Sequence, residues 1–140
     1  MNWKLILQLS LFGLAMGIAT VFAIPSMIEP AFWLVIFLIC AYWIAKNSPG
    51  LHFLHGLLLG LVNSVWITGA HVLLFDAYAA RHAQEITMMQ KAPLAVSPKM
   101  LMVIFGPAFG LIFGVILGIF AFVAGKLIKN PSAPASKAAA

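Results

Sequence analysis

Charged residues are scarce in this chain. Asp, Glu, Lys and Arg make up 8% of its 140 residues, whereas soluble globular domains are roughly a quarter charged. Hydrophobic residues make up 64%. This balance excludes a soluble globular domain and predicts an integral membrane protein.

Cysteine is almost absent as well. The single Cys40 lies inside an apolar run, so the chain can form neither an intrachain disulfide nor a metal site built from several thiolates. The histidines supply only pairs at a spacing of three residues, His52 with His55 and His82 with Glu85. Each pair offers two ligands, whereas zinc normally takes at least three from the protein. We therefore expect no metal and no cofactor.

Acidic residues number only three, against eight Lys and Arg, which gives a formal net charge of +5. Such a charge can indicate a nucleic-acid partner, but the basic residues stand singly at the ends of apolar runs and form no patch. These positions are typical of side chains that reach lipid headgroups. The expected partner is the lipid bilayer and not a nucleic acid.

Four long apolar runs dominate the rest of the chain. A transmembrane helix needs about 20 apolar residues at a rise of 1.5 Å each. We predict helices over residues 5–24, 31–46, 51–90 and 98–128, which form an all-α polytopic membrane protein, a four-transmembrane-helix bundle in one domain of residues 1–129. Residues 130–140 are rich in Pro, Ser and Ala, have nothing to bury and are expected to be a disordered tail.

The first run has a competing interpretation as a cleaved signal peptide of residues 1–23. It follows a positively charged start, and Val21-Phe22-Ala23 fits a cleavage site. Its apolar stretch is longer than the roughly 7–15 residues of a signal core, which favours a retained helix.

The basic residues also predict an orientation. With four retained helices, both termini lie on the same side of the membrane as the connector after the second helix. That side holds Lys4, Lys46, Lys126, Lys129 and Lys137. The opposite side holds Arg81, Lys91 and Lys99. The excess favours a multi-pass protein of the cell membrane with both termini in the cytoplasm.

The third predicted helix carries most of the polar side chains found inside apolar runs. Ser64, Thr68, His71 and Tyr78 recur at helical intervals and share one face. Ionisable residues inside a membrane are functional candidates, and His71 has two interpretations: a hydrogen bond to a neighbouring helix, or proton or cation handling. Asp76 lies about 140° around a straight helix from His71 and either joins this polar path at the membrane edge or is simply hydrated.

Small residues mark a second feature, the packing of the third and fourth helices. Three consecutive GxxxG units in the fourth helix allow a neighbouring backbone to approach closely. The third helix has a matching edge of small residues. The glycines concerned are Gly106, Gly110, Gly114 and Gly118 in the fourth helix and Gly56 and Gly60 in the third.

Two classes of function remain open. The favoured one is a non-enzymatic structural or interaction subunit packed through the glycine ladder, as a homo-oligomer or with other membrane proteins. The alternative is a small ion or proton channel or transporter that uses the polar face of the third helix. An enzyme is not expected, because Ser64 lies seven residues from His71 and has no base beside it.

Overall fold

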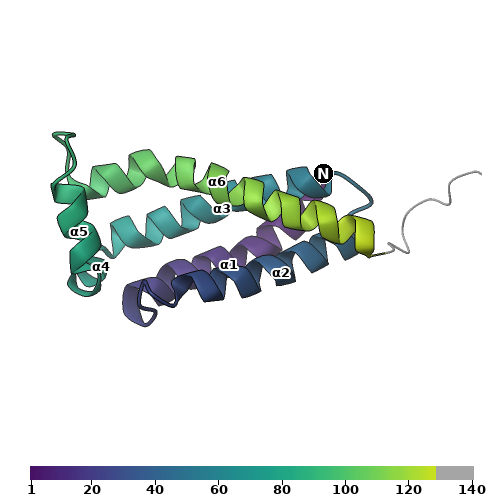
Figure 1. Ribbon diagram of the computed structural model, residues 1–140, viewed down its shortest axis with the longest axis horizontal. Coiled ribbons are helices and arrows are strands. Elements are labelled where there is room, and N and C mark those ends of the chain that lie inside the picture. Colours follow the sequence, from purple (N-terminus) through teal and green to yellow (C-terminus); the bar gives the residue numbers. More distant parts are fainter. Residues whose placement is uncertain (129–140) are drawn as a thin grey trace, which may run out of the picture.

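A computed structural model of the protein describes residues 1–128, and its regular elements in that range are all helices (Figure 1). They are α1 (Trp3–Phe22), α2 (Glu29–Asn47), α3 (His52–Leu73), α4 (Phe75–Arg81), α5 (Ala83–Gln90) and α6 (Pro98–Leu127). The tail expected over residues 130–140 lies outside the described residues.

Four of these helices, α1, α2, α3 and α6, are long and apolar enough to cross a membrane, which confirms the prediction of four apolar helices. The shortest of them, α2, has 19 residues and therefore reaches about 28 Å, close to the roughly 30 Å of a hydrocarbon core. Their length and composition indicate a membrane protein.

Side-chain caps begin two of the long helices. Asn2 Oδ1 accepts a hydrogen bond from the Leu5 backbone N–H at 3.1 Å and starts α1. Ser97 Oγ accepts one from Met100 N–H at 3.3 Å, and Pro98 follows as the first residue of α6, where its missing donor costs nothing.

The segment predicted as one helix over 51–90 is divided into α3, α4 and α5. The backbone leaves helical dihedrals at Leu74 (φ −105°, ψ 31°) and at His82 (φ −112°, ψ 45°). No Pro or Gly stands between Ala70 and Ala92, so local sequence does not cause the breaks. The bends turn α4 and α5 across one end of the long helices, where Tyr78 and His82 are buried (Figure 1).

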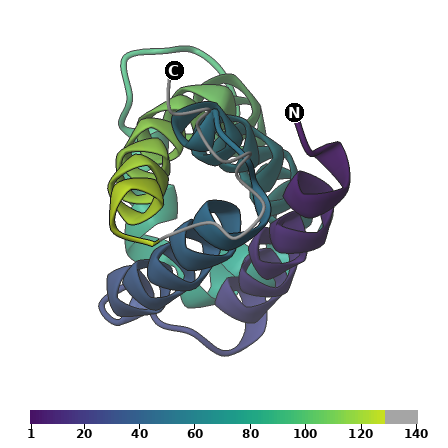
Figure 2. The same ribbon diagram turned by 90° about the vertical axis from the view of Figure 1, so that its right-hand side faces the viewer.

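The long helices follow one another around the axis in the order α1, α3, α6, α2 (Figure 2). Direct contacts between α1 and α2 are few. The start of α1 and the end of α6 lie at one end of the molecule, which we call the terminal end. The α1–α2 connection, α4 and α5 lie at the other, which we call the hairpin end.

α3 and α6 approach each other most closely through glycines. A Cβ built on Gly56 would lie 2.6 Å from the Gly118 Cα, and one on Gly114 would lie 2.6 Å from the Leu57 carbonyl oxygen. Cβ atoms essentially never come so close to other atoms, so the two backbones occupy the space of side chains. Towards the hairpin end the same edge of α6 continues, with Gly110 against Ser64 and Gly106 against Thr68.

The terminal half of the molecule is closely packed. Ile6, Ile44, Leu59 and Leu117, one from each long helix, are fully buried in one hydrophobic cluster. α2 reaches α6 through the ring of Phe37, whose centroid lies 6.2 Å from that of Phe113 and 6.4 Å from that of Phe120. Towards the hairpin end a smaller hydrophobic cluster is formed by Val21, Tyr78 and Met102.

Candidate functional site

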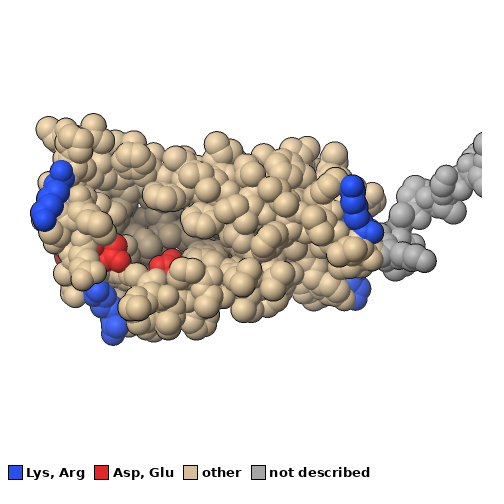
Figure 3. All heavy atoms as spheres, viewed as in Figure 1, with Lys and Arg blue, Asp and Glu red and all other residues tan. Residues whose placement is uncertain are grey.

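A cleft of about 860 Å³ lies between α2 and the α3–α6 pair, in the half of the molecule next to the hairpin end (Figure 3). We call it the lateral cleft. Its walls are mostly apolar and rich in aromatic rings, among them Trp33 and Phe37 of α2 and Phe105, Phe109 and Phe113 of α6. Pockets that hold small molecules usually have about 300–1,000 Å³ and mostly apolar walls with a few polar groups, so the cleft is within the ligand-binding range.

Four of the five residues proposed for a polar path line this cleft: Ser64, Thr68, His71 and Tyr78. Asp76 does not; it is exposed on α4, away from the lining. The bend at Leu74 separates Asp76 from α3, while Tyr78, two residues further on α4, is buried. The structure thus brings together the four residues that shared one helix face.

His71 is joined to α1 by a hydrogen bond. Its Nε2 lies 2.8 Å from Thr20 Oγ1. Thr20 Oγ1 also lies 2.9 Å from the Met16 carbonyl oxygen and 3.1 Å from that of Gly17, so this hydroxyl links His71 to the backbone of α1. A contact with a neighbouring helix, the first of the two interpretations of His71, is therefore present.

Tyr78 is held face to face between two imidazoles. The centroid of its ring lies 4.3 Å from that of His71 and 4.3 Å from that of His82. Burial raises the pKa of Tyr78 to about 12, and the carboxylates of Glu85 and Glu29 act in the same direction. The phenol stays protonated at neutral pH. Its hydroxyl has no hydrogen-bond partner among residues 1–128 and is available to an occupant of the cleft.

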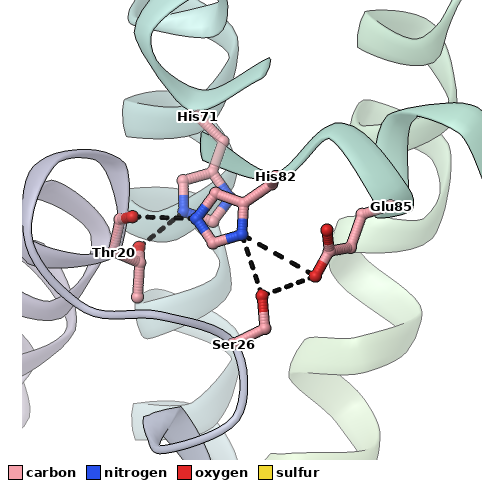
Figure 4. Close-up of polar contacts among 5 residues, drawn as sticks. All are labelled: Thr20, Ser26, His71, His82 and Glu85. Carbon is pink, nitrogen blue, oxygen red and sulfur yellow. Dashed lines mark hydrogen bonds and ion pairs between the residues drawn. The ribbon is translucent and has the colours of Figure 1, made fainter. Parts of the chain in front are cut away.

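Ser26, His82 and Glu85 form a polar cluster (Figure 4). It adjoins Tyr78, because the His82 ring stacks on the Tyr78 ring. His82 Nε2 lies 2.9 Å from the Thr20 carbonyl oxygen and so donates to it. Ser26 donates to Glu85 Oε1, and this hydrogen bond holds the pKa of Glu85 below its ordinary value. Ser26 Oγ also lies 2.9 Å from His82 Nδ1.

Ser26 is the centre of this cluster, because its hydroxyl donates to Glu85 and its Oγ also lies beside His82 Nδ1. His82 Nδ1 itself lies 3.7 Å from Glu85 Oε1. The cluster therefore ties α5 to the connection between α1 and α2 by a charge-assisted chain.

Sequence reasoning missed the contribution of α2 and its preceding turn. Glu29 and Trp33 line the cleft at the hairpin end, and Trp33 Nε1 donates to Glu29 Oε1 at 3.0 Å. Ser26 lines it too. The available signal was the connector itself: a carboxylate between two prolines at the same end of the molecule as the polar residues after position 75.

Asn63 also lines the cleft, and its Oδ1 is the one buried side-chain oxygen or nitrogen without a hydrogen bond in the described part of the chain. It lies against Gly13 of α1, where a Cβ would come within 2.9 Å of the Asn63 Cβ. The Cα–H groups of a glycine are weak donors, and they are the groups that face this oxygen.

The histidines at the terminal end have structural partners. Buried His55 accepts from the Asn2 backbone N–H at 3.0 Å and donates from Nδ1 to the Leu51 carbonyl oxygen at 2.9 Å, which fastens the start of the chain to α3. His52 Nε2 lies 3.1 Å from the Ser48 carbonyl oxygen. Residues 1–128 contain no group of three His, Cys, Asp or Glu that could hold a metal ion.

The chain was compared with models of protein families, with curated proteins and with solved structures, and none of these comparisons gives a match. The lateral cleft and its polar end are therefore the basis for assigning a function.

Proposed function

We propose that the chain is a non-enzymatic interaction subunit of the cell membrane, whose lateral cleft receives a membrane-embedded partner. Its four long helices cross one bilayer as a four-helix bundle, and a glycine zipper joins α3 to α6. The observation that carries the proposal is the cleft of about 860 Å³ with largely apolar walls. It lies between helices whose outward side chains face lipid.

The packing on either side of the cleft supports a preformed binding surface. α3 and α6 touch at backbone level through Gly56, Gly60, Gly114 and Gly118, so this wall cannot close by a tighter approach of the two helices. The hydrophobic cluster of the terminal half holds α2 at its other end. A binding surface that does not have to be ordered on association retains more of its interaction energy as affinity.

The alternative of an ion or proton channel along Ser64, Thr68, His71 and Tyr78 needs a continuous polar path. Within residues 1–128 the polar lining occupies only the hairpin half. Towards the terminal end Ile44, Leu59 and Leu117 are fully buried and fill the space between the helices. This arrangement favours binding over transport.

The proposed orientation has both termini in the cytoplasm and the polar end of the cleft outside. Among the described residues the two ends carry equal numbers of basic side chains: Lys4, Lys46 and Lys126 at the terminal end and Arg81, Lys91 and Lys99 at the hairpin end. The acidic residues Glu29, Asp76 and Glu85 all belong to the hairpin end. The positive-inside rule counts basic residues, so Lys129 and Lys137 decide the balance.

Site-specific photo-crosslinking in native membranes tests the proposal. Benzoylphenylalanine replaces Phe109, which lines the cleft, or Leu111, which is on the same helix, is similarly exposed (57% and 51%) and does not line it. We expect an adduct of one defined mass at position 109 that is lost when Leu34→Trp fills the cleft, and no such adduct at 111. Equal adducts at both positions, or one at 109 that persists in Leu34→Trp, would refute the assignment of the cleft as the interaction surface.

A further inference from the structure

We infer that the lateral cleft binds a single-chain amphiphile with a primary ammonium head, the apolar chain against the aromatic walls and the head at Glu29 and Tyr78. The inference rests on the proposed function, because it names the chemistry of the partner in the same cleft.

The cleft is polarised along its length. Aromatic side chains line its course along α6, from Phe105 through Phe109 and Phe113 to Phe120. The polar residues of the lining that come from α2, α4 and the connection before α2 all gather at the hairpin end, and acidic residues lie at the rim there (Figure 3). That end is where the long helices stop and the chain turns, so it lies at the membrane boundary. An apolar chain parallel to the helices with one polar end matches this arrangement.

The charge of Glu29 favours a cationic head group. Glu29 lines the cleft, and within residues 1–128 no Lys or Arg nitrogen lies within 4.0 Å of a carboxylate oxygen. Lys99 lies over the Phe75 ring, 5.0 Å from its centroid. A carboxylate beside apolar walls is stabilised by a counter-charge, which an ammonium head supplies and an anionic head does not.

Tyr78 is an independent second indication. It is only 8% exposed, its ring is fixed between two imidazoles, and its hydroxyl has no partner in the described chain although the residue lines the cleft. A primary ammonium carries three N–H donors. The phenol oxygen and the Glu29 carboxylate offer acceptors for them, and the ring of Trp33 beside Glu29 adds an aromatic surface that attracts cations.

The experiment uses Trp33 as a reporter inside the cleft. A variant keeps Trp33 and replaces Trp3, Trp43 and Trp66 with Phe; a matched variant keeps only Trp43, which is exposed at the far end of α2 and outside the lining. Both are placed in phosphatidylcholine nanodiscs and titrated with hexadecylamine, hexadecanol or hexadecanoate, each with a nitroxide quencher at mid-chain. We expect the amine to quench Trp33 with an affinity about tenfold higher than the alcohol, and the carboxylate to be weakest. Trp43 reports the concentration of each probe in the bilayer.

Two substitutions separate recognition of the head from membrane charge. Glu29→Gln keeps an oxygen for the Trp33 N–H and removes the charge, so the advantage of the amine over the alcohol should fall about tenfold. Asp76→Asn removes a carboxylate at the same end but outside the cleft and should change nothing.

Three outcomes would overturn the inference. Equal affinities for the three head groups would mean that the cleft binds apolar chains and does not discriminate between head groups. That result would leave the proposed interaction function intact. Equal losses in Glu29→Gln and Asp76→Asn would assign the effect to surface charge. No quenching of Trp33 beyond that of Trp43, together with a defined adduct at position 109, would mean that the partner is not an amphiphile; without that adduct the proposed function fails too.

Discussion

The contact of α3 with α6 predicts opposite responses to the same substitution at two glycines of one helix. Gly60→Ala adds a methyl group where the backbone of α6 lies: the new Cβ would be 2.5 Å from Gly114 N and 3.0 Å from the Gly110 carbonyl oxygen. Gly69→Ala adds the same methyl group where no heavy atom lies within 4 Å. Both positions are inside α3.

The magnitude follows from this geometry. Ordinary van der Waals contact begins at 3.4 Å, so α3 and α6 must move apart by about 1 Å at Gly60. Overpacking of this kind typically costs about 1–3 kcal/mol. The gain in helix propensity from Gly to Ala, up to about 1 kcal/mol in water, is common to both variants and cancels in their difference. Gly60→Ala should therefore unfold with a free energy about 1–3 kcal/mol lower than Gly69→Ala.

The assay is reversible unfolding in mixed micelles by increasing the fraction of sodium dodecyl sulfate, followed by circular dichroism. The difference between the two variants is the quantity of interest, since it is insensitive to the extrapolation to zero denaturant. Free energies within about 0.5 kcal/mol of each other would show that the glycines do not form the packing edge. The glycine zipper would then have to be abandoned.

Three further outcomes are expected. Thr20→Val leaves the ring nitrogen of His71 without its hydrogen-bond partner and should lower the unfolding free energy by about 1 kcal/mol, whereas Thr20→Ser should not; equal values for both would contradict the hydrogen bond. The pKa of Glu85 is lowered, so the stability it contributes is complete above pH 4.5, its ordinary pKa, and is lost as the pH falls through the folded value. Amide protection in α5 should fall in that acid range in the wild type and stay constant in Glu85→Gln, and a parallel fall in both would assign the change to another group. In a cysteine-free background, a cysteine at Ile28 should react with an impermeant thiol reagent outside intact cells and one at Asn47 should not; the reverse pattern would place the termini outside.

The four long helices could be predicted because lipid leaves an apolar segment of this length little choice. With no water to satisfy the backbone, a run of about 20 apolar residues forms a helix whatever its neighbours are. The expected 5–24 and 98–128 differ by at most two residues from Trp3–Phe22 and Pro98–Leu127. The division of 51–90 could not be predicted, since its helical pattern continues without a breaker. The two breaks in this segment occur together with hydrogen bonds of His71 and His82 to Thr20, which is more than fifty residues away in the sequence.

Part of the candidate site was predictable from the helical pattern of one segment. Ser64, Thr68 and His71 share a face of one helix, so a cleft that is lined by one of them can be lined by all three. Glu29 and Trp33 belong to another helix, and no pattern within a helix states how far a second helix stands from it. Asp76 shows the limit of the helical argument: an angle counted along a straight helix has no meaning across the break at Leu74.

The close contact and the cleft have one origin, the unequal faces of α6. Its glycines, from Gly106 to Gly118, face α3, and the aromatic side chains between them face the cleft and α2. In the terminal half Phe37 packs against two of these rings, whereas in the hairpin half α2 offers no side chain that fills the space beside Phe105 and Phe109. A methyl group that pushes α6 away from α3 must therefore push its aromatic face towards α2 and narrow the cleft. Gly60→Ala should accordingly weaken binding in the cleft as well as stability, while Gly69→Ala should weaken neither. This coupling links the packing of α3 and α6 to the function proposed for the space beside them.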